Sequence, residues 1–177
     1  MVRVGTGRLS YEVVEGWGNI PQGWSFTQVA GVAVDARDRV YVFNRSPHPV
    51  IVFDRHGDFL SSWGEGVFKR PHGICIDPND QVYCVDDGDH TVRKFTLEGR
   101  LLLTLGTQNK LGENGAPFNR PTNAAISPSG EIYVSDGYGN SRVHKFSAEG
   151  KLLLSWGTSG DGPGQFNIPH GVWIDKD

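Results

Sequence analysis

The most restrictive feature of this 177-residue chain is an internal repeat. Related segments run from Val29 to Gly64, from Pro71 to Gly106 and from Pro121 to Gly157, and a fourth begins at Pro169. Their starts lie 42, 50 and 48 residues apart. A period of this length is typical of folds in which each repeat is one supersecondary unit that buries its apolar face against its neighbours.

Each repeat divides into four short apolar segments. In register, the repeats begin VAGVAVDARDRVYVFN, PHGICIDPNDQVYCVD and PTNAAISPSGEIYVSD, and the next begins PHGVWIDKD. Turn clusters such as Asp-Arg-Asp, Pro-Asn-Asp and Pro-Ser-Gly separate the segments, as between strands. Four antiparallel strands in about 40 to 50 residues form one β-propeller blade. The sequence therefore predicts an all-β fold with a lead-in segment at 1–27, blades at about 28–64, 69–106 and 119–157, and the first strand of a fourth blade at 167–177.

Three blades and one strand do not close a ring, because propellers hold about four to eight blades. An open ring would leave an uncovered blade flank and unpaired strand edges, which favour association. Two interpretations remain. The chain is a fragment of a longer propeller, or two copies pair head to tail as a homodimer, with the tail from Pro169 to Asp177 adding a strand to the neighbour.

Charge and hydropathy exclude several classes of partner. The formal net charge is −3 and no segment gathers five or six like charges, so neither a nucleic-acid site nor a polybasic membrane anchor is predicted. Residues Met1 to Ser10 lack the apolar run of a signal peptide, and no stretch approaches the roughly 18 apolar residues of a membrane span. As written, the chain is expected to be cytoplasmic. Its compartment stays open, because an exported precursor could have lost its leader.

Two cysteines, Cys75 and Cys84, lie symmetrically about a predicted turn at Asn79 and Asp80. They could face each other across a hairpin and form a disulfide. The favoured interpretation is a pair of small, half-buried free thiols.

The candidate chemistry gathers on one face of the predicted propeller. The first strand of a blade lines the central channel and the second returns antiparallel, so the start of the first and the end of the second share a face. Arg45 and Tyr138 end second strands there. Histidine appears at alternate starts of the first strands, which carry Ala30, His72, Thr122 and His170.

Alternate blades of a six-bladed ring stand about 120° apart, so histidines from blades two, four and six would converge on the axis. They would give zinc three imidazoles and an open position. In the alternative interpretation, each histidine only fills the channel mouth.

The motifs resemble those of the NHL-repeat family, in particular Gly-Gln-Phe-Asn-Ile-Pro-His-Gly-Val at 164–172 and Ile-Tyr-Val-Ser-Asp at 132–136. Within it, Pro-His-Gly at 71–73, Ser-Asp-Gly-Tyr-Gly-Asn-Ser-Arg at 135–142 and Gln-Val-Ala-Gly-Val-Ala-Val-Asp at 28–35 are similar to the peptidyl-α-hydroxyglycine α-amidating lyases, which are six-bladed propellers. A propeller hosts many chemistries, so the likeness is specific for fold and weak for function.

The resemblance implies a role for each residue that matches a lyase motif. It implies that His72 and His170 are zinc ligands and that Tyr138 is the general base. It also implies that Arg45 receives the substrate carboxylate, and that the backbone carbonyls of Val32 and Ile74 bind a structural calcium ion. The third zinc histidine and the acidic calcium ligand of the family belong to a last blade that these 177 residues do not include. A family cysteine beside the tyrosine is Gly139 here, so that disulfide is absent.

These residue types suit the lyase chemistry. Removing the hydroxyl proton of an α-hydroxyglycine lets the carbon–nitrogen bond break, which gives an amide and glyoxylate. Zinc can polarise that hydroxyl, and a tyrosine becomes a usable base where positive charge stabilises its phenolate. Arginine binds a carboxylate through two hydrogen bonds. The expected function is a metal-dependent lyase for this or a related small hydroxylated or lactone-type substrate, and the alternative is a non-enzymatic scaffold that binds a protein or peptide.

The remaining polar residues of the repeats are expected to be structural. We expect His90 to brace a loop, and Asp86 and Asp136 to accept loop backbone hydrogen bonds. Three further histidines lack metal-ligand spacing and are expected on the surface or in loops, namely His48, His56 and His144.

Overall fold

The computed structural model describes residues 2–112 and 115–175. In these residues it contains β-strands and no helix, and so no helix that could cross a membrane. The strands form three four-stranded antiparallel sheets, each with its strands in chain order. This confirms the predicted all-β architecture of successive four-stranded blades.

The three sheets are named here as blades. Blade 1 contains β3 (Val29–Val34), β4 (Val40–Asn44), β5 (Val50–Phe53) and β6 (Phe59–Trp63). Blade 2 contains β7 (Pro71–Ile76), β8 (Gln81–Asp86), β9 (Thr91–Thr96) and β10 (Leu101–Leu105). Blade 3 contains β11 (Asn123–Ile126), β12 (Ile132–Asp136), β13 (Arg142–Phe146) and β14 (Leu152–Trp156).

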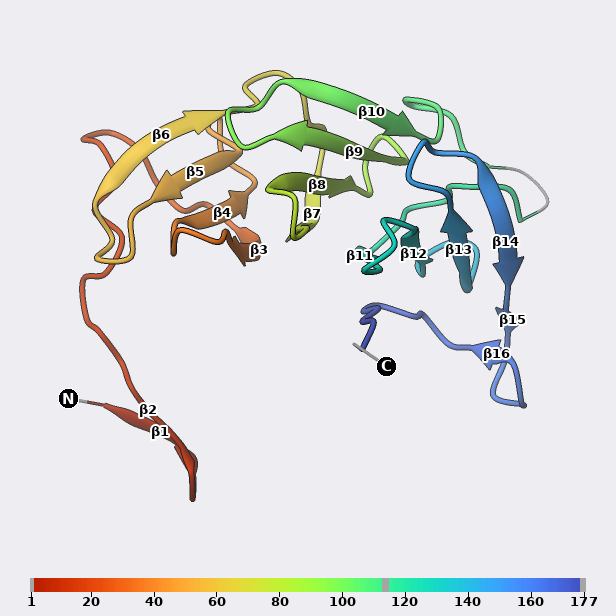
Figure 1. Ribbon diagram of the computed structural model, residues 1–177, viewed down its shortest axis with the longest axis horizontal. Helices are drawn as coiled ribbons and strands as arrows, with labels where there is room; N and C mark the ends of the chain where they lie inside the picture. Colours follow the sequence, from red (N-terminus) through yellow and green to blue (C-terminus); the bar gives the residue numbers. More distant parts are fainter. Residues whose placement is uncertain (1, 113–114, 176–177) are drawn as a thin grey trace.

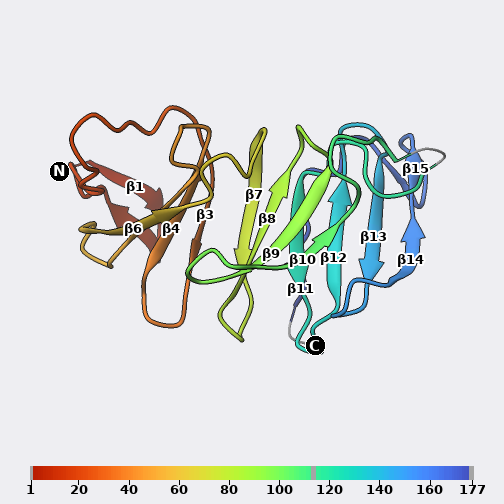
Figure 2. The same cartoon turned by 90° about the horizontal axis from the view of Figure 1, so that it is seen from above.

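The blades lie side by side in an open arc. Figure 1 shows the first strands β3, β7 and β11 on the inner side of the arc and the fourth strands β6, β10 and β14 at its rim. In Figure 2 the connecting loops gather at the two ends of the strands. The inner strands approach closely, since a Cβ atom on Gly31 would lie 3.1 Å from the Cγ2 atom of Ile74. The arc therefore brings the starts of its first strands together.

The same turn chemistry joins the first and second strand of each blade. In blades 1 and 2 an aspartate ends the first strand and accepts backbone hydrogen bonds from two turn residues, Asp35 from Arg37 and Arg39, and Asp77 from Asn79 and Gln81. In blade 3 the Ser127 hydroxyl accepts from the backbone N–H of Glu131. These bonds satisfy turn amides that the ladder leaves unpaired.

Apolar residues of alternating strand positions fill the spaces between the blades. Between blades 1 and 2 the buried cluster includes Tyr41, Phe43 and Phe95, and between blades 2 and 3 it includes Tyr83, Phe118 and Phe146. Each aromatic side chain removes a large apolar area from water, which holds neighbouring blades in a fixed relation.

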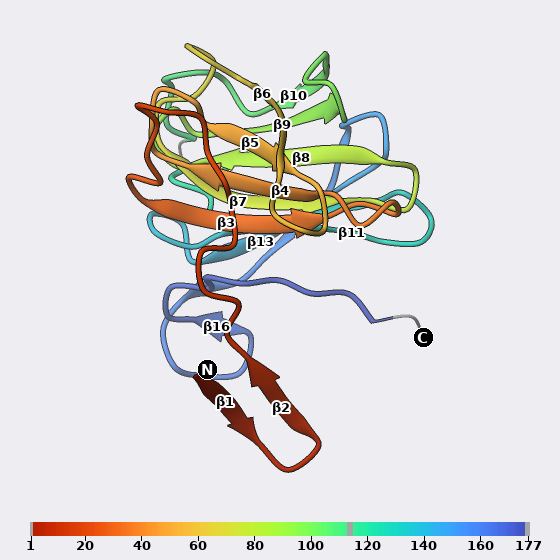
Figure 3. The same cartoon turned by 90° about the vertical axis from the view of Figure 1, so that its left-hand side faces the viewer.

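The lead-in segment is partly folded onto blade 1. Its first residues form a hairpin of β1 (Arg3–Thr6) and β2 (Leu9–Glu12), which projects away from the blades in Figure 3. Farther along, apolar side chains of the segment pack against the flank of blade 1 that has no neighbouring blade among the described residues. There Trp17, Ile20, Trp24 and Phe26 contact the cluster of Val42, Ile51 and Phe53. The expectation of an uncovered flank is therefore wrong for these positions, because side chains of the lead-in pack on them. The β3 residues Val29, Val32 and Val34 remain exposed.

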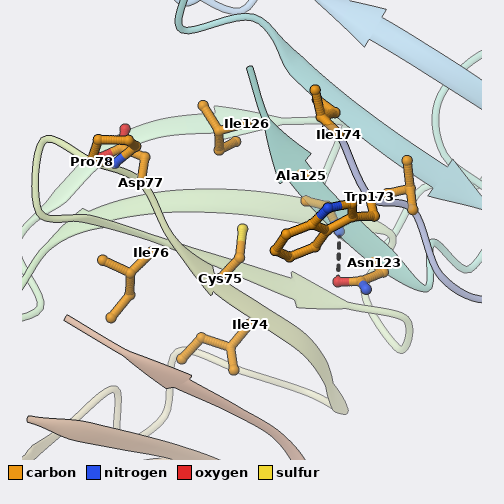
Figure 4. Close-up of a pocket in the computed structure, with 12 residues that line it drawn as sticks. Ile74, Cys75, Ile76, Asp77, Pro78, Asn123, Ala125, Ile126, Trp173 and Ile174 are labelled. Carbon is orange, nitrogen blue, oxygen red and sulfur yellow. Dashed lines mark hydrogen bonds between the residues drawn. The ribbon is translucent and has the colours of Figure 1, made fainter. Parts of the chain in front are cut away.

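The C-terminal segment crosses the inner side of blade 3. After β15 (Thr158–Ser159), which pairs in parallel with β16 (Gln165–Phe166), residues 167–175 form no strand. The predicted first strand of a fourth blade is thus not formed in the described part, because a strand needs a ladder partner and the described residues hold no second strand for it. Residues 176–177 of that prediction lie outside the described residues. Figure 4 shows Trp173 and Ile174 beside the inner strands of blades 2 and 3, where they line an apolar pocket with Cys75 and Ile126.

Candidate functional site

A β-bulge at the start of β7 sets the position of His72. Pro71 pairs with Asp86 and Ile74 with Cys84, so β7 holds one residue more than β8 between these pairs. Bulges turn side chains away from the regular alternation of a strand. His72 lies in this bulge and is buried, with 8% of its surface exposed.

The contacts of His72 fix which of its ring nitrogens carries the proton. Its Nδ1 atom lies 2.7 Å from the backbone oxygen of Thr122, which can only accept, so Nδ1–H is the donor. Burial lowers the pKa of His72, although the charge of Asp87 and the bond to Thr122 act in the opposite direction. The neutral ring therefore presents the Nε2 lone pair, which lies 3.1 Å from the Tyr138 hydroxyl.

The Tyr138 hydroxyl contacts both predicted zinc ligands. It lies 3.0 Å from Nε2 of His170, and the ring centroids of His72 and His170 are 4.8 Å apart. The Thr122 hydroxyl lies 2.9 Å from the carbonyl oxygen of Pro169, the residue before His170. Thr122 thus contacts the segments of both histidines. Sequence reasoning placed it in register with them but gave it no role.

Arg45 lies beside this group, on the side of blade 1. Its Nε atom donates to the carbonyl oxygen of Pro71 at 2.9 Å, and its Nη1 atom donates to Oε1 of Gln28 at 3.0 Å. These bonds use two of the five guanidinium N–H groups. The side chain is therefore fixed next to His72 with donors left over.

A shallow pocket of about 230 Å³ opens beside the histidines. Its lining includes Ala30, Val32, His72, Ile74, Asn123 and His170. Val32 and Ile74 thus lie near the predicted zinc ligands, while the calcium role of their carbonyls stays a prediction. Within residues 2–112 and 115–175 no three His, Cys, Asp or Glu side chains form a metal-binding group.

Sequence reasoning missed a charged group on the outer side of Tyr138. The guanidinium of Arg120 lies 4.8 Å from the centre of the Tyr138 ring, in a cation–π arrangement. The Nη2 atom of Arg120 lies 3.3 Å from Oδ2 of the buried Asp87. The Nη1 atom of Arg70 lies 2.8 Å from the same oxygen. The available signal was the dipeptide Arg-Pro, which recurs in register at 70–71 and 120–121.

The predicted structural residues divide into confirmed and wrong expectations. Asp86 accepts backbone hydrogen bonds from Lys69 and Arg70, Asp136 from Asn119, and His90 Nδ1 from the backbone of Arg120. These confirm the expectations for the three residues.

The expectation that His144 lies on the surface or in a loop is wrong. It is fully buried on β13, with Nδ1 2.7 Å from the Ser155 hydroxyl and Nε2 3.1 Å from Oδ2 of Asp136. The polar partners explain how an imidazole occupies an inward-facing strand position.

The alternative in which the two cysteines face each other across the hairpin is excluded, and the favoured interpretation of two free thiols is confirmed. Cys75 lies opposite Tyr83 and Cys84 lies opposite Ile74, so the two cysteines stand on adjacent rungs and face opposite sides of the sheet. Cys75 packs toward blade 3, and Cys84 belongs to the cluster shared with blade 1. Both are free thiols.

Comparison with known proteins identifies the repeat. The model of the NHL repeat matches residues 68–95 and 118–146, which cover most of the first three strands of blades 2 and 3. This chain carries NHL repeats.

Three curated relatives share the NHL-containing region. The chain is 33% identical to the rat peptidylglycine alpha-amidating monooxygenase over 82% of the chain and 18% of that protein. It is 34% identical to human NHL repeat-containing protein 3 over 97% of the chain and 53% of that protein. It is 30% identical to a probable peptidyl-alpha-hydroxyglycine alpha-amidating lyase of Caenorhabditis elegans over 85% of the chain and 50% of that protein. The chain thus spans between about a fifth and about half of the length of these relatives.

A solved structure agrees on the fold. The streptogramin B lyase matches 77% of this chain and 41% of its own with a TM-score of 0.58, at 13% sequence identity. At this identity the likeness concerns the fold alone. Together the comparisons show an NHL-type propeller that resembles lyase-like proteins.

Proposed function

We propose that this chain supplies part of a metal-dependent lyase site that cleaves a peptidyl-α-hydroxyglycine, or a related hydroxylated substrate, to an amide and glyoxylate. The observation that carries the proposal is the meeting of His72, Tyr138 and His170 at one point, with the two Nε2 atoms 3.1 Å and 3.0 Å from the Tyr138 hydroxyl. The name of the nematode relative supports the substrate class.

His72 and His170 fit a zinc ion in donor type, and the tautomer of His72 fits it as well. The Thr122 carbonyl holds the proton of His72 on Nδ1, which leaves Nε2 free to coordinate, as outer hydrogen bonds do for metal-bound histidines. Catalytic zinc sites usually have three protein ligands, so the two imidazoles of this chain would hold zinc with reduced affinity. Zinc bound there would act as a Lewis acid toward the substrate hydroxyl.

The other residues would bind the substrate and move its proton. Arg45, fixed by Pro71 and Gln28, offers its remaining donors to the carboxylate of the hydroxyglycine. Tyr138 takes the hydroxyl proton, and the guanidinium of Arg120 lies over its ring. The carbon–oxygen bond then becomes a carbonyl, the carbon–nitrogen bond breaks, and the amide nitrogen keeps the electron pair and gains a proton. The products are a peptide amide and glyoxylate.

One experiment distinguishes this proposal from a non-enzymatic scaffold, which the name of human NHL repeat-containing protein 3 leaves open. Zinc binding by the purified chain is measured by equilibrium dialysis against buffered zinc, and glyoxylate release from an N-acetyl-dipeptidyl-α-hydroxyglycine is then measured at a saturating zinc concentration. Bound zinc with glyoxylate release above the rate in zinc-free buffer supports the lyase. Folded protein with neither zinc nor release supports a scaffold that binds a peptide or protein.

A further inference from the structure

The buried carboxylate of Asp87 holds two arginines at the outer edge of the site. Asp87 lies directly after β8 and its side chain is fully buried, whereas the side chains of Arg70 and Arg120 are 42% and 44% exposed. Both guanidinium groups contact the same atom, Oδ2 of Asp87. They therefore lie close together, with their outer donors facing solvent.

The backbone fixes the two arginines from several sides. The N–H of Arg120 donates to Nδ1 of His90, and its carbonyl oxygen accepts from the N–H of Tyr138 at 3.4 Å. The N–H of Arg70 donates to Oδ1 of Asp86. These bonds fix the backbone at both positions, and the contacts with Asp87 reduce the freedom of the two side chains, so a ligand would have less entropy to remove.

The charges in this group do not cancel. Two guanidinium groups oppose the single carboxylate of Asp87, and its other oxygen, Oδ1, is buried without a hydrogen-bond partner among the described residues. The neighbouring Asp86 is occupied by backbone N–H groups, among them those of Lys69, Arg70 and Gly88. An excess of positive charge therefore remains at the exposed arginine tips.

We propose that Arg70 and Arg120, held on Asp87, form an anion-binding subsite that takes an acidic side chain of the residue before the hydroxyglycine. The location of the two arginines supports this subsite, since the Tyr138 hydroxyl contacts the histidines while the face of the Tyr138 ring lies under Arg120. A carboxylate bound to Arg120 would therefore lie beside the Tyr138 ring, whose hydroxyl contacts the two histidines. The identity of the substrate rests on the proposed function, but the binding of the acidic group does not.

The test measures binding of two inert peptides by calorimetry. N-acetyl-Glu-Gly and N-acetyl-Gln-Gly lack the hydroxyl group, so they cannot react, and they differ only in the acidic side chain. We expect the chain to bind the Glu peptide about fivefold more tightly, as for charge-assisted hydrogen bonds at a partly exposed site. In Arg70→Gln and Arg120→Gln the affinities for the two peptides should become equal within about twofold, while Arg120→Lys should retain part of the preference.

The matched control is Arg100→Gln, which removes an exposed arginine from the turn between β9 and β10. It should keep the full preference for the Glu peptide. The subsite would be overturned if the unsubstituted chain bound the two peptides with equal affinity or bound neither of them. It would also be overturned if the preference survived in the double variant Arg70→Gln/Arg120→Gln. A preference with the expected mutant pattern in a protein that never releases glyoxylate supports the subsite and contradicts the lyase proposal instead.

Discussion

The phenol of Tyr138 has two separable parts at the candidate site. Its hydroxyl contacts His72 and His170, while its ring carries the cation–π contact with Arg120. Tyr138→Phe removes only the oxygen and keeps the ring. We expect turnover to fall by about 10²- to 10⁴-fold, the range of a general base, with zinc retained. Glyoxylate release and metal content of the same preparation check this, and turnover within a few-fold of the unsubstituted chain would mean that another group is the base.

The two thiols give a prediction that depends on pH. Burial raises the pKa of Cys75 to about 12, and burial likewise raises the pKa of Cys84. The reactive thiolate is therefore scarce in the folded protein at pH 8, and iodoacetamide should label both residues at least about 100-fold more slowly than in denaturant. Because both pKa values are raised on folding, the free energy of unfolding should fall as pH rises above the ordinary thiol range, about 8.5. Fast labelling of both thiols in folded protein, followed by mass spectrometry, would contradict the raised pKa values.

At the residue scale, sequence could predict some neighbours and not others. His72 and His170 were placed together because they start first strands in register, and the structure brings them to one hydroxyl. The repeated Arg-Pro dipeptide marks Arg120, but its contacts with Tyr138 and Asp87 could not be predicted, because they depend on the conformation of the loops between blades. His144 was misjudged because its burial depends on the specific partners Ser155 and Asp136.

At the scale of elements, the bulge in β7 and the approach of β11 together hold His72. A Cβ atom on Gly73 would lie 2.8 Å from the Thr122 carbonyl oxygen, which is the acceptor for His72 Nδ1. The position therefore tolerates no side chain without a shift of the inner strands.

Substitutions at two glycines test this coupling. Gly73→Ala should push Thr122 away from His72 and weaken zinc binding about tenfold, although no ligand changes. Gly171→Ala is the matched control, because Gly171 follows His170 as Gly73 follows His72, and a Cβ atom there meets no atom within 4 Å. Zinc titration of both variants provides the comparison. Equal zinc affinities would show that the strand contact does not position His72.

The strands were the most predictable elements. Alternating β-branched and aromatic residues between repeated turn signals identify β4, β8 and β12. The register of the hairpins was harder to predict from the sequence, because one extra turn residue changes which side chains lie opposite each other. Cys75 and Cys84 are an example. Residues 167–175 have the sequence pattern of a strand but do not form one, because the described residues provide no partner strand for them.

At the scale of the whole molecule, the lead-in segment decides what a second copy could reach. Trp17, Trp24 and Phe26 cover the apolar flank of blade 1, which a head-to-tail partner would otherwise contact. We therefore expect the chain to be a monomer of 19.4 kDa and the double variant Trp17→Ser/Phe26→Ser to associate. Light scattering over a range of concentrations measures both. A compact particle of twice that mass for the unsubstituted chain would instead support the closed ring of two copies.

The arc of blades brings His72 and His170 to one hydroxyl, and we propose that the two imidazoles hold a metal ion. Zinc affinity of single variants, measured by competition with a chromophoric chelator, tests it most directly. His72→Ala and His170→Ala should each weaken zinc binding by at least about 100-fold, because each removes one of two imidazole ligands. His56→Ala, which removes an exposed histidine of the β5–β6 turn, should leave the affinity within about twofold. Unchanged zinc affinity in both His72→Ala and His170→Ala would contradict the account.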